Sequence, residues 1–303
     1  VDYLESTGVR FGADLNASTS FDETIYELTV PTDSARLFEK GFQILADWSR
    51  ALTFDSTELA RERNVVIEEW RLGRGASARM RDKQFPVVFS GSRYADRIPI
   101  GDKHTLETAP RSQVKRFYDD WYRPDLMAVV AVGDFDKLKV ERLIKAQFGS
   151  WTVKKPERPR QSFPVPDHDS TLVTIATDSE ATRSTVAVYY LQPLRPQKTV
   201  GDFREEIVGS LYNDMLNARL QEIAQRPGAP FIGAFSNQGR LIRTKDVYVL
   251  TAITPDSGVE AGLRAVVTEG ERVAQHGFTA TELDRVKRET LRAMESAYAE
   301  RDK

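Results

Sequence analysis

The sequence predicts an α+β protein with two tandem, similar domains, each a mostly antiparallel sheet covered by helices on one side. Three observations support this class. Stretches in which apolar and polar residues alternate, such as residues 24–30, are followed by stretches with apolar residues at helical spacing. The same order of strands and helices recurs on both sides of a proline-rich stretch. A chain of 303 residues, 40% hydrophobic and 29% charged, is long and apolar enough for two domains.

The first predicted domain, residues 1–155, opens with a hairpin. Residues 10–31 are rich in β-branched and aromatic side chains and indicate two strands with a turn near Ser20 to Glu23. Two helices follow, "SARLFEKGFQILADWSRAL" and "FDSTELARERNVVIEEWRLGRG", the second with Asp55 or Ser56 as its N-cap. The polar stretch 73–97 is not assigned. A helix at 110–122, a buried strand "LMAVVAVGD" and a helix "FDKLKVERLIKAQFGSW" complete the domain.

The second predicted domain, residues 170–303, follows a proline-rich linker at 156–169. Two strands, "TLVTIATD" and "TVAVYYLQP", precede a long helix around residues 202–225. The stretch "RPGAPFIGAFSNQG" indicates a loop followed by an edge strand, and "DVYVLTAITP" indicates another strand. Helices are expected from Val259 onward.

The two ends of the chain indicate a piece of a longer protein. The chain begins at Val1, and "VDYLESTG" is typical of the last two turns of a helix that ends at Gly8. The pattern at the other end stays helical up to Lys303 without a stop signal. We therefore expect the first domain to be truncated at its N-terminal side and the second at its C-terminal side.

Composition excludes several classes of function. The formal net charge of −2 provides no general attraction for nucleic acid or an anionic membrane. The absence of cysteine excludes disulfides, thiolate metal sites and a cysteine nucleophile, and it favours an exported, bacterial periplasmic location. No apolar run approaches the ~18–20 residues that a membrane span requires.

The stretch "RERNVVIEEWR", residues 61–71, contains three glutamates around a short apolar run. Residues seven apart on a helix point in nearly the same direction, so Glu62 and Glu69 share a face. Because Val65 and Val66 lie between them, we expect this face to pack inward and Glu68 to be solvated. Two inward glutamates require a cation, either an arginine or a metal, and the charge pattern leaves both open. For an isolated helix, a surface pair between Glu62 and a neighbouring arginine is the simpler interpretation.

Three segments in this order resemble the insulinase/pitrilysin family of zinc peptidases, which includes the mitochondrial processing peptidases. They are "GADLNASTSFDETIY", "RERNVVIEE" and "PIGDKHTLETAPRSQVKRFYDDWYRPDLMAVVAVGDFD". The resemblance is continuous over residues 1–151 and extends to the family's second domain from about Leu172 onward. It implies that Glu69 is a zinc ligand and that Glu62 orients a metal-bound histidine. It also implies that Asn16, Ala17 and Ser18 form the edge strand to which a peptide substrate adds as a further strand. Without the family, this segment is a plain sheet edge.

The chain departs from the family in one respect. The inverted motif His-x-x-Glu-His, which supplies two zinc ligands and the general base, is absent. The three histidines, His104, His168 and His276, lie far apart in the sequence and are interpreted as surface residues. We expect the motif upstream of Val1, zinc in the complete protein and none bound to this chain.

We therefore predict that the chain is part of a zinc metalloendopeptidase that hydrolyses peptides or unfolded protein segments. This chain alone is expected to be inactive. The family resemblance implies a second half of a clamshell, in the same parent chain or in a partner subunit. Two alternatives stay open. One is a non-catalytic family member that acts as a scaffold or peptide-binding subunit, and the other is a product of proteolysis.

Overall fold

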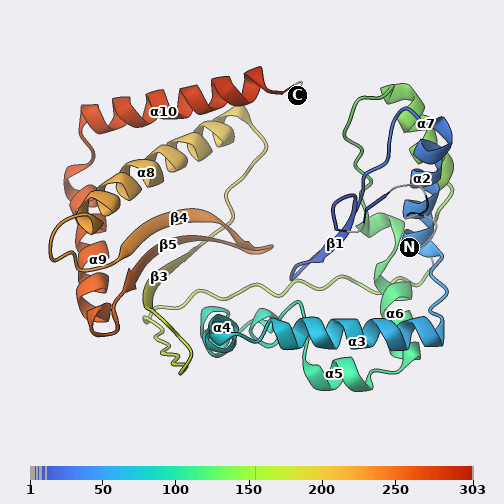
Figure 1. The fold of residues 1–303 in the computed structure, drawn as a ribbon, viewed down its shortest axis with the longest axis horizontal. Helices are drawn as coiled ribbons and strands as arrows, with labels where there is room; N and C mark the ends of the chain where they lie inside the picture. The colour runs from blue at the N-terminus through green and yellow to red at the C-terminus, as the bar shows by residue number, and fades with distance from the viewer. Residues whose placement is uncertain (1–3, 5, 7–8, 11, 154, 302–303) are drawn as a thin grey trace. The chain divides into compact units, whose positions relative to one another are not determined.

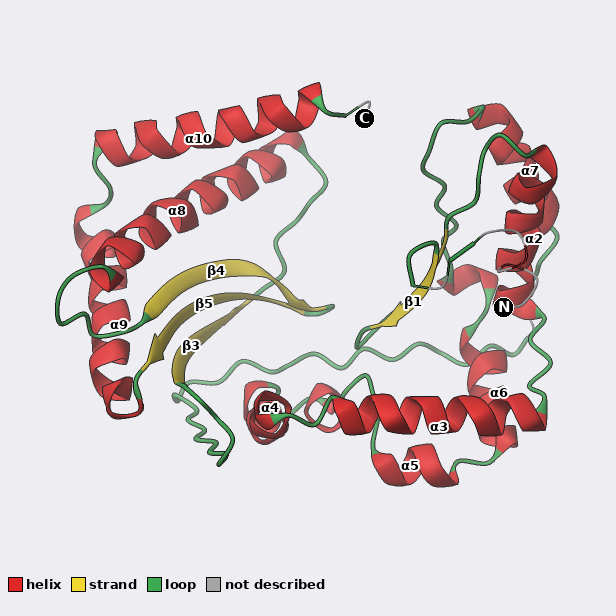
Figure 2. Ribbon diagram, in the orientation of Figure 1, coloured by secondary structure: helices red, strands yellow, loops and turns green. Residues whose placement is uncertain are grey.

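A computed structural model describes residues 4, 6, 9–10, 12–153 and 155–301. The helix predicted for "VDYLESTG" lies largely outside the described residues. The chain forms two compact units, the first made of Val1–Arg74 and Asp96–Ser162 and the second of Gly75–Ala95 and Phe163–Lys303. Figure 1 follows the chain from blue to red, and Figure 2 distinguishes helices from strands. The predicted α+β class with antiparallel sheets is confirmed.

The first unit contains the predicted hairpin and a set of helices. Strand β1 (Leu15–Thr19) pairs antiparallel with β2 (Thr24–Leu28), and the Ser20 N–H donates to the Glu23 carbonyl at 2.9 Å across the turn. The helices are α2 (Ala35–Arg50), α3 (Ser56–Leu72), α5 (Lys103–Thr108), α6 (Arg111–Trp121) and α7 (Lys137–Phe148), with a 3-10 turn η2 (Pro124–Leu126). A further 3-10 turn, η1 (Arg93–Asp96), lies where the chain returns to this unit.

Helix α2 connects two apolar clusters in the described part of the first unit. One cluster joins Leu15 and Leu28 of the hairpin to Ile44 and Trp48 of α2. In the other, Phe38 and Phe42 of α2 pack with Val140 of α7, and the two phenyl rings meet edge to face at 5.5 Å. Burial of these side chains holds the hairpin and both helices together.

The second unit is a three-stranded sheet covered by helices. Its sheet has the order β3 (Ser184–Gln192), β5 (Lys245–Thr254), β4 (Gly233–Ile242), and both pairings are antiparallel. Helices α8 (Val200–Ala224) and α9 (Val259–His276) pack on the sheet, and α10 (Ala280–Ala299) packs against α8 (Figures 1 and 2). A short 3-10 turn, η3 (Asp256–Gly258), precedes α9. The buried core lies between sheet and helices: Leu216, Leu220, Phe231, Leu250, Ala252, Val266 and Val273.

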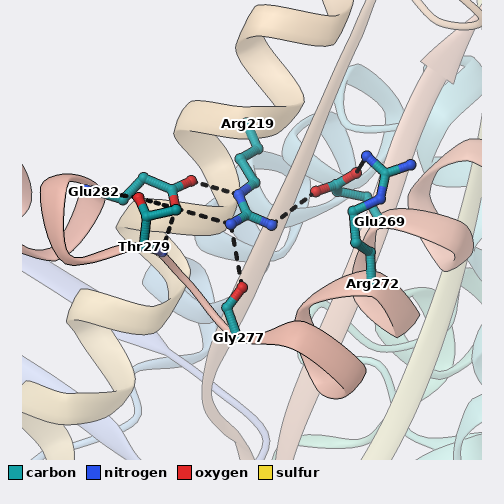
Figure 3. Close-up of polar contacts among 6 residues, drawn as sticks. All are labelled: Arg219, Glu269, Arg272, Gly277, Thr279 and Glu282. Carbon is teal, nitrogen blue, oxygen red and sulfur yellow. Dashed lines mark hydrogen bonds and ion pairs between the residues drawn. The ribbon is translucent and has the colours of Figure 1, made fainter.

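One arginine joins helices α8, α9 and α10 of this unit (Figure 3). The Arg219 guanidinium of α8 forms two hydrogen bonds with the Glu282 carboxylate of α10, at 2.5 and 2.8 Å, and one with Glu269 of α9 at 3.2 Å. Glu282 also accepts the Thr279 N–H in a capping box that begins α10. Hydrogen bonds with Arg219, the largest effect, lower the pKa of Glu282 to about 2.

Most predicted elements of the second unit are confirmed. The long helix is α8, the predicted edge strand is β4 at one side of the sheet, and the following strand is β5. The unassigned polar stretch contains helix α4 (Ala76–Val88), which has Pro86 in its interior and belongs to the second unit. Residues 156–169 form no helix or strand. The domain limits inferred from the sequence stay a prediction.

Two predicted strands are wrong in this structure. Residues 126–134 and 171–178 belong to no strand ladder among the described residues, and several of their apolar side chains are exposed. The physical reason is that a strand forms only when a second strand accepts and donates its backbone hydrogen bonds. An apolar stretch indicates that a segment is suited to a sheet, but it does not provide that second strand. The described part of the chain offers neither segment such a partner.

Candidate functional site

Helix α3 carries the two glutamates of interest, and its first turn is well capped. The Asp55 carboxylate accepts the N–H groups of Thr57 and Glu58 at 2.8 and 3.1 Å. These hydrogen bonds, the Glu58 N–H first, lower the pKa of Asp55. The cap fixes where α3 begins.

The packed face of α3 differs from the predicted one. Side chains at helical spacing are half-buried along one stripe: Leu59, Arg63, Val66, Ile67 and Trp70. Arg63 anchors this stripe, because its guanidinium donates to the carbonyls of Glu107 and Ala109 at 2.5 and 2.6 Å, at the end of α5. This stripe is turned by about 100° from the direction of Glu62 and Glu69.

The expectation that Glu62 and Glu69 point inward is therefore wrong. Both are exposed, and neither carboxylate forms a hydrogen bond or ion pair with any described residue. Beside them, Val65 and Leu72 are 58% and 75% exposed. Two glutamates and two apolar residues thus form an uncovered stripe on α3.

The neighbouring charges on α3 do not neutralise this stripe. Glu68 is exposed, as predicted, and pairs with Arg71 at 2.7 Å. Arg61 pairs with Glu58 at 2.8 Å, so the surface pair that an isolated helix would favour for Glu62 is absent among the described residues. A shallow, open depression along this side of the helix is lined by Asn64, Val65, Glu68, Glu69, Leu72 and Gly73.

The described residues do not form a zinc site on their own. No three side chains among the described histidines and carboxylates lie close enough to hold a metal ion. His104, His168 and His276 are all exposed, which confirms their interpretation as surface residues, and His168 Nδ1 lies 2.6 Å from the Ser170 carbonyl. Glu69 fits one carboxylate position of a zinc site, and the described residues do not complete it.

The second candidate site is the outer edge of β1, which among the described strands pairs with β2 alone. Two hydrogen bonds fix which residues face that edge. The Thr29 N–H donates to the Asp14 carbonyl at 2.7 Å, and the Ser20 N–H donates to Glu23. Hydrogen-bonded pairs alternate along an antiparallel ladder, so every second residue between Asp14 and Ser20 directs its backbone toward β2.

Only one of the three predicted substrate-binding residues turns its backbone to the open edge. Asn16 and Ser18 direct their N–H and C=O groups to β2, and Ala17 directs its groups outward. The Ala17 N–H is not free, because the Asn16 side-chain Oδ1 accepts it at 2.8 Å. The neighbouring outward carbonyl, that of Leu15, accepts the Gly12 N–H at 2.9 Å. The open edge is therefore short and centred on Ala17.

Aromatic side chains hold the β2 side of this hairpin against the neighbouring helices. The Tyr26 and Tyr122 hydroxyls lie 2.5 Å apart, and the Tyr118 hydroxyl donates to the Trp48 carbonyl at 2.7 Å. Burial, the largest effect, raises the pKa of Tyr118 to about 12 and raises that of Tyr26 as well. These phenols stay neutral near pH 7; the pair between Tyr26 and Tyr122 ties β2 to the end of α6, and Tyr118 ties α6 to α2.

Comparison with protein families places these features in context. The model for "Peptidase M16 inactive domain" matches residues 108–290, more than half of the chain. The model for "Insulinase (Peptidase family M16)" matches residues 2–74, which include β1 and α3. The chain belongs to peptidase family M16. As an M16 chain, it carries the glutamate helix and the hairpin in the region that the insulinase model covers.

Named relatives agree with this assignment. The chain is 37% identical over 303 residues to the "Zinc protease PQQL-like" of Arabidopsis thaliana and 31% identical over 306 residues to the "Probable zinc protease PqqL" of Escherichia coli. Both alignments cover 100% of this M16 chain but only 29% and 33% of the relatives, so it spans about a third of their length.

A solved structure gives the same fold. The first half of the periplasmic protease PqqL from Escherichia coli superposes with a TM-score of 0.86 at 30% identity. The match covers 99% of this chain and 64% of that one. Among the described residues of the M16 chain, no helix is both long and apolar enough to span a membrane.

Proposed function

We propose that this chain is part of a zinc-dependent metalloendopeptidase that hydrolyses peptides or unfolded protein segments. In this proposal, Glu69 binds the zinc ion and Glu62 accepts a hydrogen bond from a metal-bound histidine. Both histidine ligands and the general base come from residues outside this chain. Zinc, when bound, supplies Lewis-acid chemistry at the scissile carbonyl.

The observation that carries the proposal is the uncovered stripe on α3. Its four members, Glu62, Val65, Glu69 and Leu72, recur every three or four residues and are exposed together. Apolar side chains at this spacing indicate a face that a further element covers. Carboxylates on a covered face require a cation or a hydrogen-bond donor. A metal-binding helix meets both requirements, because it brings apolar residues and histidine ligands to the same face.

Peptide binding is assigned to the open edge of β1. An added strand would hydrogen-bond with the Ala17 backbone, which makes binding depend little on the substrate's side chains. Before a peptide can bind there, the hydrogen bond from the Ala17 N–H to the Asn16 side chain must break. Asn16 therefore competes with the substrate for one backbone donor.

Replacement of Asn16 by alanine is expected to strengthen peptide binding about fivefold, because one net hydrogen bond contributes ~1 kcal/mol. The measurement is fluorescence anisotropy of fluorescein-labelled casein titrated with this chain. Ser18→Ala is the matched control, because Ser18 is also exposed on β1 but directs its backbone to β2. Equal affinities for all three proteins would contradict the role of Asn16. Absence of any binding would contradict the edge as a substrate site.

The remaining features of the whole protein are also proposals. A second half of a clamshell, in the same polypeptide or in a partner subunit, would complete the enzyme. An exported location is supported by the absence of cysteine and by the description of the Escherichia coli relative as a periplasmic protease.

The proposal is tested with the longer polypeptide that contains this chain. Its hydrolysis of fluorescein-labelled casein should be lost with 1,10-phenanthroline and restored by added Zn²⁺, whereas this chain alone should cleave nothing under the same conditions. Hydrolysis that survives the chelator, or cleavage by this chain alone, would refute the proposal.

The alternative is a non-catalytic subunit that binds peptides without cleaving them. It is favoured by the match of residues 108–290 to a domain described as inactive. The two functions differ in metal content. A peptidase should retain about one zinc per longer polypeptide after dialysis, and a scaffold should retain none while still binding casein.

A further inference from the structure

Residues 171–177 of the second unit have the form of a strand without a partner. From Val173 onward their exposure alternates: Val173 and Ile175 are 74% and 85% exposed, and the residue after each, Thr174 and Ala176, is half-buried. A period of two residues is that of an extended chain with one face on a core. Figure 2 draws this part of the chain as loop, ahead of β3.

The backbone of this segment is unpaired. Within the described chain, the N–H and C=O groups of residues 171–176 form no hydrogen bond, and only the Thr177 carbonyl accepts one, from Lys83 Nζ at 3.4 Å. Strand β3 is also incomplete, because it pairs with β5 on one side and with no described strand on the other. A strand with an unpaired edge is a template for a further strand.

The turn between the two open edges is firmly built. The Asp178 carboxylate accepts two hydrogen bonds from Arg79 of α4, both at 2.6 Å, and the Asp178 carbonyl accepts the Ala181 N–H at 3.1 Å. Hydrogen bonds from Arg79, the largest effect, lower the pKa of Asp178 to about 2. Residues 178–183 therefore form a well-fixed connection between residues 171–177 at one end and β3 at the other.

The connection is long enough for a strand to lie between its arms. Adjacent strands lie ~4.8 Å apart, so two arms on either side of a third strand are separated by roughly 10 Å. Six residues reach up to about 20 Å when extended. Arms joined by so short a connection normally pair with each other, yet here both keep open edges.

The geometry points to a strand acceptor: one extended segment pairs with β3 on one side and with residues 171–177 on the other. Its chemistry follows from the acceptor. The inserted strand has branched apolar side chains at alternate positions. These side chains would lie beside the exposed Val173 and Ile175, and cross-strand pairs of β-branched apolar residues stabilise a sheet.

The occupant is a strand of the same polypeptide, from the part that lies outside these 303 residues. Two observations favour this source over a second copy. The named relatives are about three times as long as this chain, so they offer the sequence for such a strand. The first unit repeats the pattern, with exposed Val130 and Val132 on an unpaired extended segment. Pairing one copy's residues 171–177 with the same residues of another copy would leave β3 open. The inference does not rest on the proposed peptidase activity.

Hydrogen exchange of backbone amides tests the acceptor directly. In the 303-residue chain, amides of residues 171–176 should exchange at nearly the rate of unstructured peptide. In the longer polypeptide they should exchange at least about a hundredfold more slowly, as hydrogen-bonded strands do. Equal, fast exchange in both proteins would overturn the proposal. Protection that appears in the 303-residue chain only at high protein concentration would overturn it in favour of a second copy.

A pair of variants provides a second readout. Ile175→Lys should leave the Tm of the 303-residue chain within about 1 °C, because this side chain is already exposed. In the longer polypeptide, the same change should lower Tm by several degrees and restore fast exchange at residues 171–176. Val200→Lys is the matched control, because Val200 is 87% exposed at the start of α8 and lies outside the acceptor. Equal shifts for both variants in the longer polypeptide would contradict a specific strand site.

Discussion

Replacement of Glu69 by glutamine in the longer polypeptide is expected to reduce bound zinc and casein hydrolysis by at least about a hundredfold. A neutral amide is a poor zinc ligand, and loss of even an outer-shell partner costs 10–100-fold in metal affinity or activity. Glu69 is exposed on α3 and has no partner among the described residues, so its removal breaks no contact that stabilises this chain. The measurements are zinc per polypeptide after dialysis and the rate of hydrolysis of fluorescein-labelled casein.

The adjacent glutamate provides the matched control. Glu68 lies one residue away on the same helix, is also exposed and, among the described residues, pairs with Arg71. Glu68→Gln should leave zinc content and hydrolysis within about twofold. Glu62→Gln should fall between the two, with a loss of about 10–100-fold, because Glu62 is assigned to a histidine and not to zinc. Full zinc content in Glu69→Gln would remove this residue from the metal site.

Local elements of the fold could be predicted because their signals lie within short stretches of sequence. The turn from Ser20 to Glu23 fixes the register of β1 and β2, since each residue before Ser20 pairs with one after Glu23. The same register identifies Ala17 as the residue that faces the open edge. The sequence therefore contained the information to choose among Asn16, Ala17 and Ser18, but the alternation of hydrogen bonds had to be counted from the turn.

The orientation of α3 could not be predicted from its own residues. Val65 and Val66 are adjacent, so either could mark the packed face, and the two choices differ by about 100°. Long-range contacts decide between them, because Arg63 donates to carbonyls more than 40 residues away, at Glu107 and Ala109. An arginine that packs inward through hydrogen bonds with helix-end carbonyls leaves no hydrophobic signal in the sequence.

The two missing strands have a different cause. The stretches "LMAVVAVGD" and "TLVTIATD" have the composition of buried strands, and the structure leaves both without a ladder. The composition of a segment indicates only which structure that segment is suited to form. Whether the partner strand exists within the same 303 residues is a separate question, and apolar exposure at Val130 and Ile175 indicates that these segments lack one here.

Replacement of Arg219 by alanine is expected to destabilise the second unit by roughly 3 kcal/mol, because it leaves buried carboxylates without their main cation. Glu269 is only 4% exposed in its side chain, and Glu282 loses its two hydrogen bonds from Arg219 (Figure 3). The loss lies at the lower end of the range for broken buried pairs, since Arg272 still pairs with Glu269 at 2.9 Å. The measurement is thermal unfolding, in which Tm should fall by roughly 10 °C.

Arg264→Ala is the matched control, because Arg264 pairs with Glu260 on the same helix as Glu269 but both partners are largely exposed. Its cost should stay below about 0.5 kcal/mol.

The pH dependence of the free energy of unfolding separates the ion pair of Arg219 from simple packing of its side chain. The pKa of Glu282 is about 2 in the folded chain against an ordinary 4.5, so its contribution is present above pH 4.5 and is lost as pH falls toward 2. The stability gap between wild type and Arg219→Ala should therefore narrow over that window. A gap that stays constant between pH 6 and pH 3 would assign the effect to the packing of the Arg219 side chain on the Phe278 ring, whose centroid lies 4.8 Å away.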